Sequence, residues 1–303
     1  MKFSVPAIFL AFAAAASAAP TTSYFAGFNL GHTHKSGSCK TTAAWTQEFK
    51  KIKSWSTGGK GTFNTVKLFS TNDCNALEMA VPAAKAAGVK IWVGVWNTPE
   101  DKFNAEKAAL ERALKAHPDT AKWLAGINVG SESLYRKDVQ PWRLAEQIYD
   151  VKGMVQTAYK SPNTPVGTAD TWTMWVDGAN AAVIKACDVV LMNGFPYWQG
   201  ATIGESLGKF KDAITNTRNA VGINKPFVIG ETGHPTKGDN FGNAVASVQN
   251  AAAYWKAAAC YLQTTNIPWL WFSGFDEPNK SGTIEQNFGV ALSNQPLKFS
   301  LKC

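Results

Sequence analysis

The sequence contains few of the residues that bind metal ions. It has only four histidines, no HExxH motif and no aspartate-rich loop, so metal-dependent hydrolysis is disfavoured. Its five cysteines fit no zinc-binding spacing. In a secreted chain they allow two disulfides and one leftover thiol, in any of about fifteen arrangements. We expect neither a metal nor a cofactor.

Long hydrophobic runs are absent beyond the first twenty residues. Lys2, the apolar run over residues 5–16 and the small triplet Ala16, Ser17, Ala18 predict a signal peptide over residues 1–18. No later run could span a membrane, and no hydrophobic tail follows Lys302. We therefore expect a secreted, extracellular protein without membrane insertion, whose residues 19–303 form one domain.

The lysines form no basic block, although the formal net charge is +8. Such a balance is compatible with binding to nucleic acid or to an anionic cell wall. Because the lysines are spread through helix-like segments, we interpret them as solvated helix faces and expect no nucleic-acid partner. We expect a monomer. One glycosylation sequon begins at Asn279.

Glycine-rich phosphate loops and low-complexity linkers are also missing. Instead, short runs rich in β-branched and aromatic residues alternate with helix-length segments such as 44–55, 75–87, 104–116, 139–159 and 205–221. We expect Asp138 to cap the fourth of these helices and Pro82 to shorten or bend the second. The eight strand-like runs are 24–30, 65–69, 90–96, 126–129, 166–169, 188–193, 227–229 and 269–272.

Eight repeats of strand and helix favour an α/β fold with a closed (β/α)8 TIM barrel over an open sheet. In this fold, active sites lie at the carboxyl ends of the strands. Glu132 follows the fourth run and Glu231 follows the seventh. Both carboxylates are therefore predicted to face one mouth of the barrel.

Two facing carboxylates are what cleavage of a glycosidic bond requires. One donates a proton to the leaving oxygen, and the other attacks or stabilises the anomeric carbon. A lone glutamate of this kind is a capping or ion-paired residue about as often as it is catalytic. Two glutamates at equivalent positions favour the catalytic interpretation. A serine nucleophile is disfavoured because the G-x-S-x-G pattern fails at Ser133. Trp96, Trp172, Trp198 and Trp271 lie at strand ends, where their rings could stack on sugars.

Four ordered motifs, INVGSE (127–132), NGFPYW (193–198), VIGETG (228–233) and FDEPNK (275–280), resemble glycoside hydrolase family 17. The nearest likeness is the fungal branch of secreted cell-wall endo-β-1,3-glucanases and 1,3-β-glucanosyltransferases. The resemblance implies a retaining enzyme that acts on β-1,3-glucan and laminari-oligosaccharides in the cell wall.

Carried over by motif, the resemblance implies Glu132 as proton donor and Glu231 as nucleophile. It implies a place near the nucleophile for Tyr197, and contacts to sugar hydroxyls for Glu277 and Lys280. Ser131 departs from the plant relatives, which commonly have Asn there. We expect the substrate-binding residues to be Ser131, Asn193, Tyr197, Trp271, Glu277 and Lys280.

Three functions fit these residues. The first is the retaining β-1,3-glucan enzyme, with water or a second glucan as acceptor and carboxyl groups about 5 to 5.5 Å apart. The second is a barrel glycosidase for another β-glucan linkage. The third is a wall protein that binds glucan without cleaving it, which would need stacking rings but no pair of catalytic acids.

Overall fold

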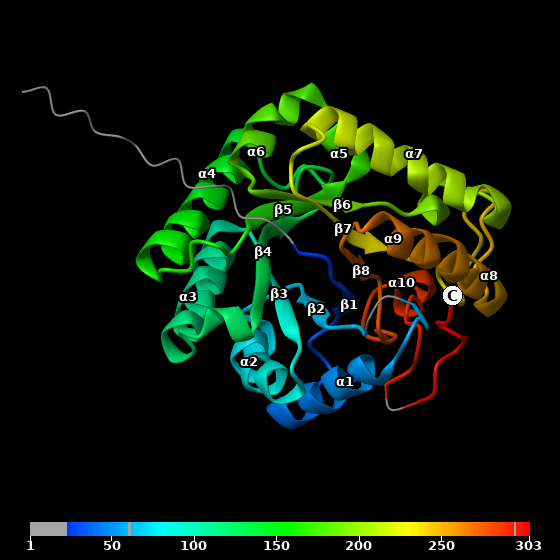
Figure 1. Cartoon of the computed structure of the whole chain (residues 1–303), viewed down its shortest axis with the longest axis horizontal. Coiled ribbons are helices and arrows are strands. Elements are labelled where there is room, and N and C mark those ends of the chain that lie inside the picture. Colours follow the sequence, from blue (N-terminus) through cyan, green and yellow to red (C-terminus); the bar gives the residue numbers. More distant parts are fainter. Residues whose placement is uncertain (1–22, 60–61, 294) are drawn as a thin grey trace, which may run out of the picture.

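The computed structural model describes residues 23–59, 62–293 and 295–303; the predicted signal peptide lies outside this part of the chain. Eight parallel strands form a closed barrel in sequence order, and helices surround it (Figure 1). Pairing of the first strand with the eighth, with Gly27 opposite Leu270, closes the barrel. The predicted (β/α)8 barrel is therefore confirmed.

Each strand coincides with one of the eight predicted runs and differs from it only at the ends. The strands are β1 Ala26–Leu30, β2 Thr65–Leu68, β3 Lys90–Val95, β4 Leu124–Ser131, β5 Val166–Thr171, β6 Val189–Asn193, β7 Phe227–Thr232 and β8 Trp269–Trp271.

The helices lie outside the barrel (Figure 1). They are α1 Thr42–Ser54, α2 Ala76–Ala87, α3 Glu100–Ala116, α4 Pro141–Lys152, α5 Trp172–Trp175, α6 Ala181–Ala186, α7 Ile203–Val221, α8 Val248–Tyr254, α9 Cys260–Thr265 and α10 Thr283–Gln286. Short 3-10 segments lie at Asp73–Asn75, Thr120–Lys122, Gly178–Asn180 and Pro196–Gln199, and π-helical segments at Gly153–Ala158 and Trp255–Ala259.

One expectation about helix ends was wrong, and another holds only in part of its terms. Asp138 does not cap α4, which begins at Pro141 with Gln140 as its N-cap, because proline fits the first turn but blocks extension upstream. The Asp138 carboxylate instead accepts a hydrogen bond from Arg136 at 3.0 Å. Of the two effects expected of Pro82, shortening does not occur, because α2 runs past it to Ala87 and is capped by Gly88 with a φ of 66°; bending stays a prediction.

Alternation along the strands divides the core into two hydrophobic clusters. On β6, Val189 and Leu191 point into the barrel, where they join a small cluster with Trp92 and Leu270. The alternate residues of β6, Val190 and Met192, point outward and join the larger cluster against the helices. Side chains therefore fill the barrel itself, and space for a substrate remains only at its ends.

The cysteines form two disulfides, Cys39–Cys74 and Cys260–Cys303. Cys187 remains as a buried thiol, and burial raises its pKa to about 12. The structure thus selects one of the arrangements that the sequence allowed.

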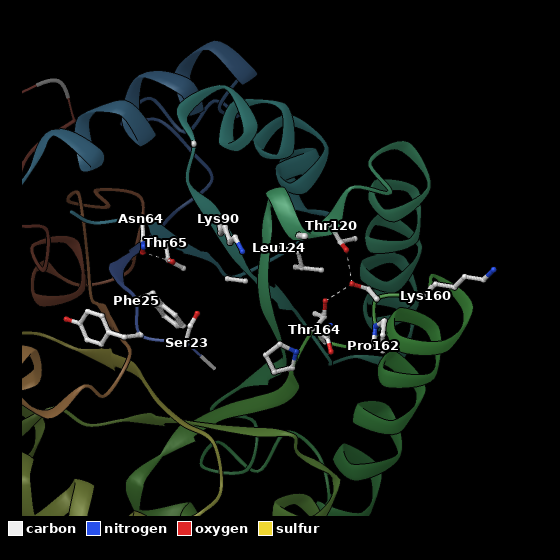
Figure 2. Close-up of a pocket in the computed structure, with 17 residues that line it drawn as sticks. Ser23, Phe25, Asn64, Thr65, Lys90, Thr120, Leu124, Lys160, Pro162 and Thr164 are labelled. Atoms are coloured by element: carbon white, nitrogen blue, oxygen red, sulfur yellow. Dashed lines mark hydrogen bonds between the residues drawn. The ribbon is translucent and has the colours of Figure 1, made fainter. Parts of the chain in front are cut away.

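A cavity of about 570 Å³ opens at the amino ends of the strands (Figure 2). Asn64 precedes β2, Lys90 begins β3, Leu124 begins β4 and Thr164 precedes β5, and all four line this cavity. Because active sites of this fold lie at the opposite end, we expect the functional site at the carboxyl ends of the strands.

Candidate active site

A local irregularity in β7 turns Glu231 into the barrel. Ile229 pairs with Met192, but the next residue of β6, Asn193, pairs with Glu231, so Gly230 is an extra residue in β7. Such a bulge reverses the alternation of side chains beyond it. Val228 and Glu231 therefore both face inward, whereas regular alternation would direct Glu231 toward the helices.

A second irregularity presents Glu132. Asn128 pairs with Gly167 and Ser131 pairs with Ala169, which leaves one extra residue in β4. Gly130 has a φ of 76° there, a left-handed conformation that glycine adopts without steric cost. Glu132 follows with a φ of 56° at the carboxyl end of the strand.

The Glu231 carboxylate is buried and paired. Its side chain is 8% exposed, and Oε1 lies 2.6 Å from Lys67 Nζ, whose side chain has no exposed surface. The Ser131 hydroxyl donates to the same oxygen at a long 3.5 Å. The ammonium group compensates for burial of the negative charge, which would otherwise be costly.

The Glu132 carboxyl group has weaker partners. Asn193 Nδ2 donates to Oε1 at 2.9 Å, and Arg136 lies 3.9 Å from Oε2. Burial raises the pKa of Glu132, and the nearby charge of Glu231 raises it further. Glu132 thus holds its proton at a higher pH than an ordinary glutamate does, as a proton donor must.

Both carboxylates line one cavity of about 440 Å³. The Trp198 and Phe241 rings form one wall, with centroids 5.2 Å apart and both side chains partly exposed. Rings and a few polar groups are typical of a sugar-binding cleft. The remaining lining residues are Tyr135, Thr171, Trp172, Thr173, Asn193, Phe195, Gln199, Phe272, Glu285 and Phe288.

Of the predicted substrate-binding residues, Ser131 and Asn193 lie at this cavity through their bonds to the two glutamates. Glu277 lies in a neighbouring cavity of about 360 Å³. Lys280 Nζ is 3.3 Å from Glu277 and 4.2 Å from the centre of the Phe272 ring, so it stands between the two cavities.

Tyr197 and Trp271 were wrongly expected to contact the substrate. Tyr197 is fully buried, and its hydroxyl donates to the carbonyl of Asp239. The residues of its motif that line the cavity are Asn193, Phe195 and Trp198. Trp271 is 1% exposed and packs on Trp255, with ring centroids 4.6 Å apart, because alternation along β8 directs it to the helices.

Lys67 and Glu285 are two site residues that were not predicted from the sequence. The signal for Lys67 was present, because a lysine in the middle of the apolar run 65–69 must be buried and paired once that run becomes a barrel strand. Glu285 gave no such signal. Burial raises its pKa, and the Lys280 charge opposes this shift.

Neither a metal site nor a membrane-spanning helix is found among the residues that the structure describes. No group of three His, Cys, Asp or Glu side chains there could hold a metal ion. No helix within these ranges is long and apolar enough to cross a membrane.

A barrel that brings two carboxylates into one aromatic cavity at the strand carboxyl ends has the architecture of a glycoside hydrolase. Residues 27–289 match the BtgE/BtgC glycoside hydrolase domain, and the chain belongs to this family.

Named relatives support the same assignment. The chain is 38% identical to a glucan 1,3-beta-glucosidase of Saccharomyces cerevisiae, over 91% of this chain and 90% of the relative. It is 37% identical to a glucan 1,3-beta-glucosidase of Candida albicans, over 91% and 92% of the two chains.

A solved structure extends the likeness to three dimensions. The glycoside hydrolase family 17 beta-1,3-glucanosyltransferase of Rhizomucor miehei is 33% identical, with a TM-score of 0.80, over 92% of this chain and 98% of that one. The resemblance to family 17 that the four motifs indicated is therefore confirmed.

Proposed function

We propose that this protein is a secreted, retaining enzyme that cleaves internal β-1,3-glucosidic bonds and passes the glycosyl unit to water or to another glucan in the cell wall. The observation that carries the proposal is the pair Glu132 and Glu231 in one aromatic cavity. An active-site mutant of the Rhizomucor miehei relative in complex with laminaritriose supports the choice of substrate.

The first step transfers the donor sugar to the protein. A Glu231 oxygen attacks the anomeric carbon while Glu132 gives its proton to the leaving oxygen, so the glycosidic bond breaks and a glycosyl ester forms. In the second step Glu132, now ionised, takes a proton from the acceptor hydroxyl. That oxygen attacks the anomeric carbon and releases Glu231, which restores the original configuration.

The neighbouring side chains suit these two roles. Lys67 and Ser131 hold Glu231 Oε1, which leaves the other oxygen for attack. Asn193 and Arg136 orient Glu132 without the close ion pair that would favour early loss of its proton. The difference between the two environments separates nucleophile from acid, as retaining glycosidases require.

A defined laminari-oligosaccharide tests the proposal. We expect β-configured products by NMR, and products longer than the donor if sugar is the acceptor. Glu231→Gln should lower turnover by roughly 10³-fold or more while the fold, measured by circular dichroism, is kept. Parental turnover by Glu231→Gln, α-configured products, or cleavage of 1,4- or 1,6-linked glucan in preference would overturn the proposal.

A further inference from the structure

Asp170 carries a carboxyl group that does not line the catalytic cavity. It lies in β5 and has no exposed surface. Neighbouring Thr171 lines the cavity, and alternation turns Asp170 to the other side of the strand, toward the segment that follows β4. A carboxyl group so deeply buried requires hydrogen-bond partners.

Its partners are backbone amides of the segment that follows the proton donor and of the end of β5. Oδ2 accepts the N–H of Leu134 at 2.9 Å, and Oδ1 accepts the N–H of Thr171 at 2.8 Å. One residue earlier in β5, the carbonyl of Ala169 accepts the N–H of Glu132 at 2.8 Å. The end of β5 therefore holds the backbone at Glu132 and two residues beyond it.

The segment Glu132, Ser133, Leu134 needs this support. Glu132 has a φ of 56°, a left-handed conformation that is unfavourable for a residue other than glycine and persists only when neighbours fix it. A second contact, from the Ser133 hydroxyl to Asn97 Oδ1 at 2.7 Å, holds the same segment from the β3 side. Loss of either contact would loosen the turn that aims the Glu132 side chain.

We propose that Asp170 is a positioning residue that fixes Glu132 in the orientation needed to protonate the leaving oxygen. The inference rests on the proposed function, in which Glu132 is the acid. Asp170 does not itself touch the cavity. Its effect on the orientation of Glu132 therefore reaches the reaction through the backbone amides that it holds, such as that of Leu134.

The charged groups that act on Glu132 and Asp170 can each be named. Glu132 faces Asp170 from the end of β4, while Arg136, Lys67 and Glu231 act on Glu132 from the following loop, from β2 and from β7. None of them accepts the Leu134 amide in place of Asp170. The holding role therefore belongs to the Asp170 carboxyl.

A positioning role predicts dependence on the leaving group. A sugar leaving group needs a proton in the transition state, whereas 2,4-dinitrophenolate leaves without one. Misplacement of Glu132 should therefore slow cleavage of laminarihexaose and spare 2,4-dinitrophenyl β-laminaribioside. General destabilisation would slow both alike.

The test compares kcat/KM on these two substrates for Asp170→Asn and for a matched control, Glu106→Gln. Glu106 is also fully buried and accepts the backbone N–H of Thr71 at 2.6 Å, but it holds the segment after β2. We expect Asp170→Asn to lose about 10 to 100-fold on laminarihexaose and less than about threefold on the aryl substrate. Glu106→Gln should not change the ratio of the two.

Equal losses on both substrates, or no loss, in Asp170→Asn would overturn the inference. If that variant does not fold, Asp170→Ser, whose single, closer oxygen cannot accept the N–H groups of both Leu134 and Thr171, decides by the same ratio. Glu132→Gln, measured on the same two substrates, distinguishes failure of the positioning role from failure of the proposed function. Selective loss in Glu132→Gln without selective loss at Asp170 refutes the positioning role alone, whereas parental activity of Glu132→Gln refutes the acid assignment.

Discussion

Among single residues, Lys67 shows how the barrel interior serves the reaction. Its ammonium lies 2.6 Å from Glu231, and both side chains are buried. In Lys67→Met the carboxylate would remain buried without this cation, a loss that typically costs about 3 to 5 kcal/mol of stability. We expect turnover of a laminari-oligosaccharide to fall roughly 10²-fold as well, because the nucleophile loses the group that orients it.

Lys40→Met is the matched control for Lys67→Met. Lys40 and Glu48 form another buried pair, 2.7 Å apart, beside the second cavity. Its loss should lower the free energy of unfolding to a similar extent while folded molecules keep most of their turnover on laminaritriose. Equal loss of turnover in both variants would contradict a specific role for Lys67.

Residue types at strand ends predicted the acids but not the residues around them. Glu132 and Glu231 could be found because carboxylates at the ends of barrel strands must share one mouth. Tyr197 and Trp271 were misplaced because alternation within a short strand or turn decides which side a ring faces. The inward direction of Glu231 depends on the extra residue Gly230, which no residue pattern reveals.

Whole elements were more predictable than their ends. All eight strands could be located because buried parallel strands are short apolar runs between helices. The start of α4 could not, because Pro141 and Asp138 are competing signals and only packing shows which one applies. The cysteine pairing was also hidden, since it depends on which elements meet in the closed barrel.

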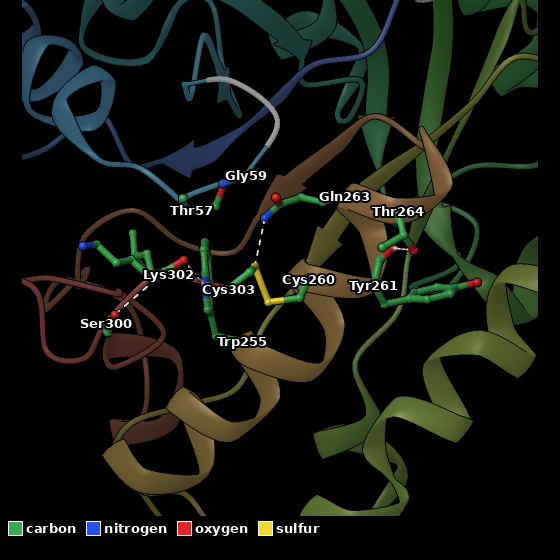
Figure 3. Close-up of a disulfide and its surroundings, with 12 residues drawn as sticks. Thr57, Gly59, Trp255, Cys260, Tyr261, Gln263, Thr264, Ser300, Lys302 and Cys303 are labelled. Atoms are coloured by element: carbon green, nitrogen blue, oxygen red, sulfur yellow. Dashed lines mark hydrogen bonds between the residues drawn. A yellow bond between two sulfur atoms is a disulfide. The ribbon is translucent and has the colours of Figure 1, made fainter.

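The Cys260–Cys303 disulfide ties the end of the chain to α9 (Figure 3). Trp255 Nε1 also donates to the carbonyl of Leu301 at 3.0 Å, and Cys303 N donates to that of Thr57 at 2.7 Å. The bridge closes a loop of 43 residues. By loop-closure entropy, Cys303→Ser should lower the free energy of unfolding by up to about 4 kcal/mol.

Urea denaturation of Cys303→Ser measures this loss. Turnover at low temperature should stay near parental, because the bridge lies away from the residues that line the catalytic cavity. Cys187→Ser, which removes a thiol but no bridge, controls for loss of a sulfur atom. An unchanged unfolding midpoint in Cys303→Ser would show that the hydrogen bonds alone fix the chain end.

Across the whole molecule, the two cavities at the carboxyl ends are separated by one short segment. Glu285 and Phe288 line the catalytic cavity, whereas Gln286 and Asn287 line the second. A glucan longer than the first cavity would meet the second next. We expect kcat/KM to rise from laminaritriose to laminarihexaose, and Gln286→Ala to reduce this gain while sparing the triose. An equal effect of Gln286→Ala on both substrates would argue against occupation of the second cavity.

The buried acids also make stability depend on pH. Burial raises the pKa of Asp170 from 3.8 to about 7 in the folded protein. Between these values the folded state binds a proton that the unfolded state has lost, so stability falls as pH rises through this window. The full shift corresponds to roughly 4 kcal/mol.

Asp170→Asn isolates this contribution, because the other buried acids, including Glu132 and Glu48, are present in both proteins. Relative to Asp170→Asn, the parental protein should lose unfolding free energy between pH 4 and pH 8, measured by urea denaturation at intervals of half a pH unit. Below about pH 3 the difference should be constant, since Asp170 is then protonated in both states. A difference that stays constant over the whole range would mean that the pKa of Asp170 is the same in the folded and unfolded proteins, so that the amides of Leu134 and Thr171 fully offset the effect of burial.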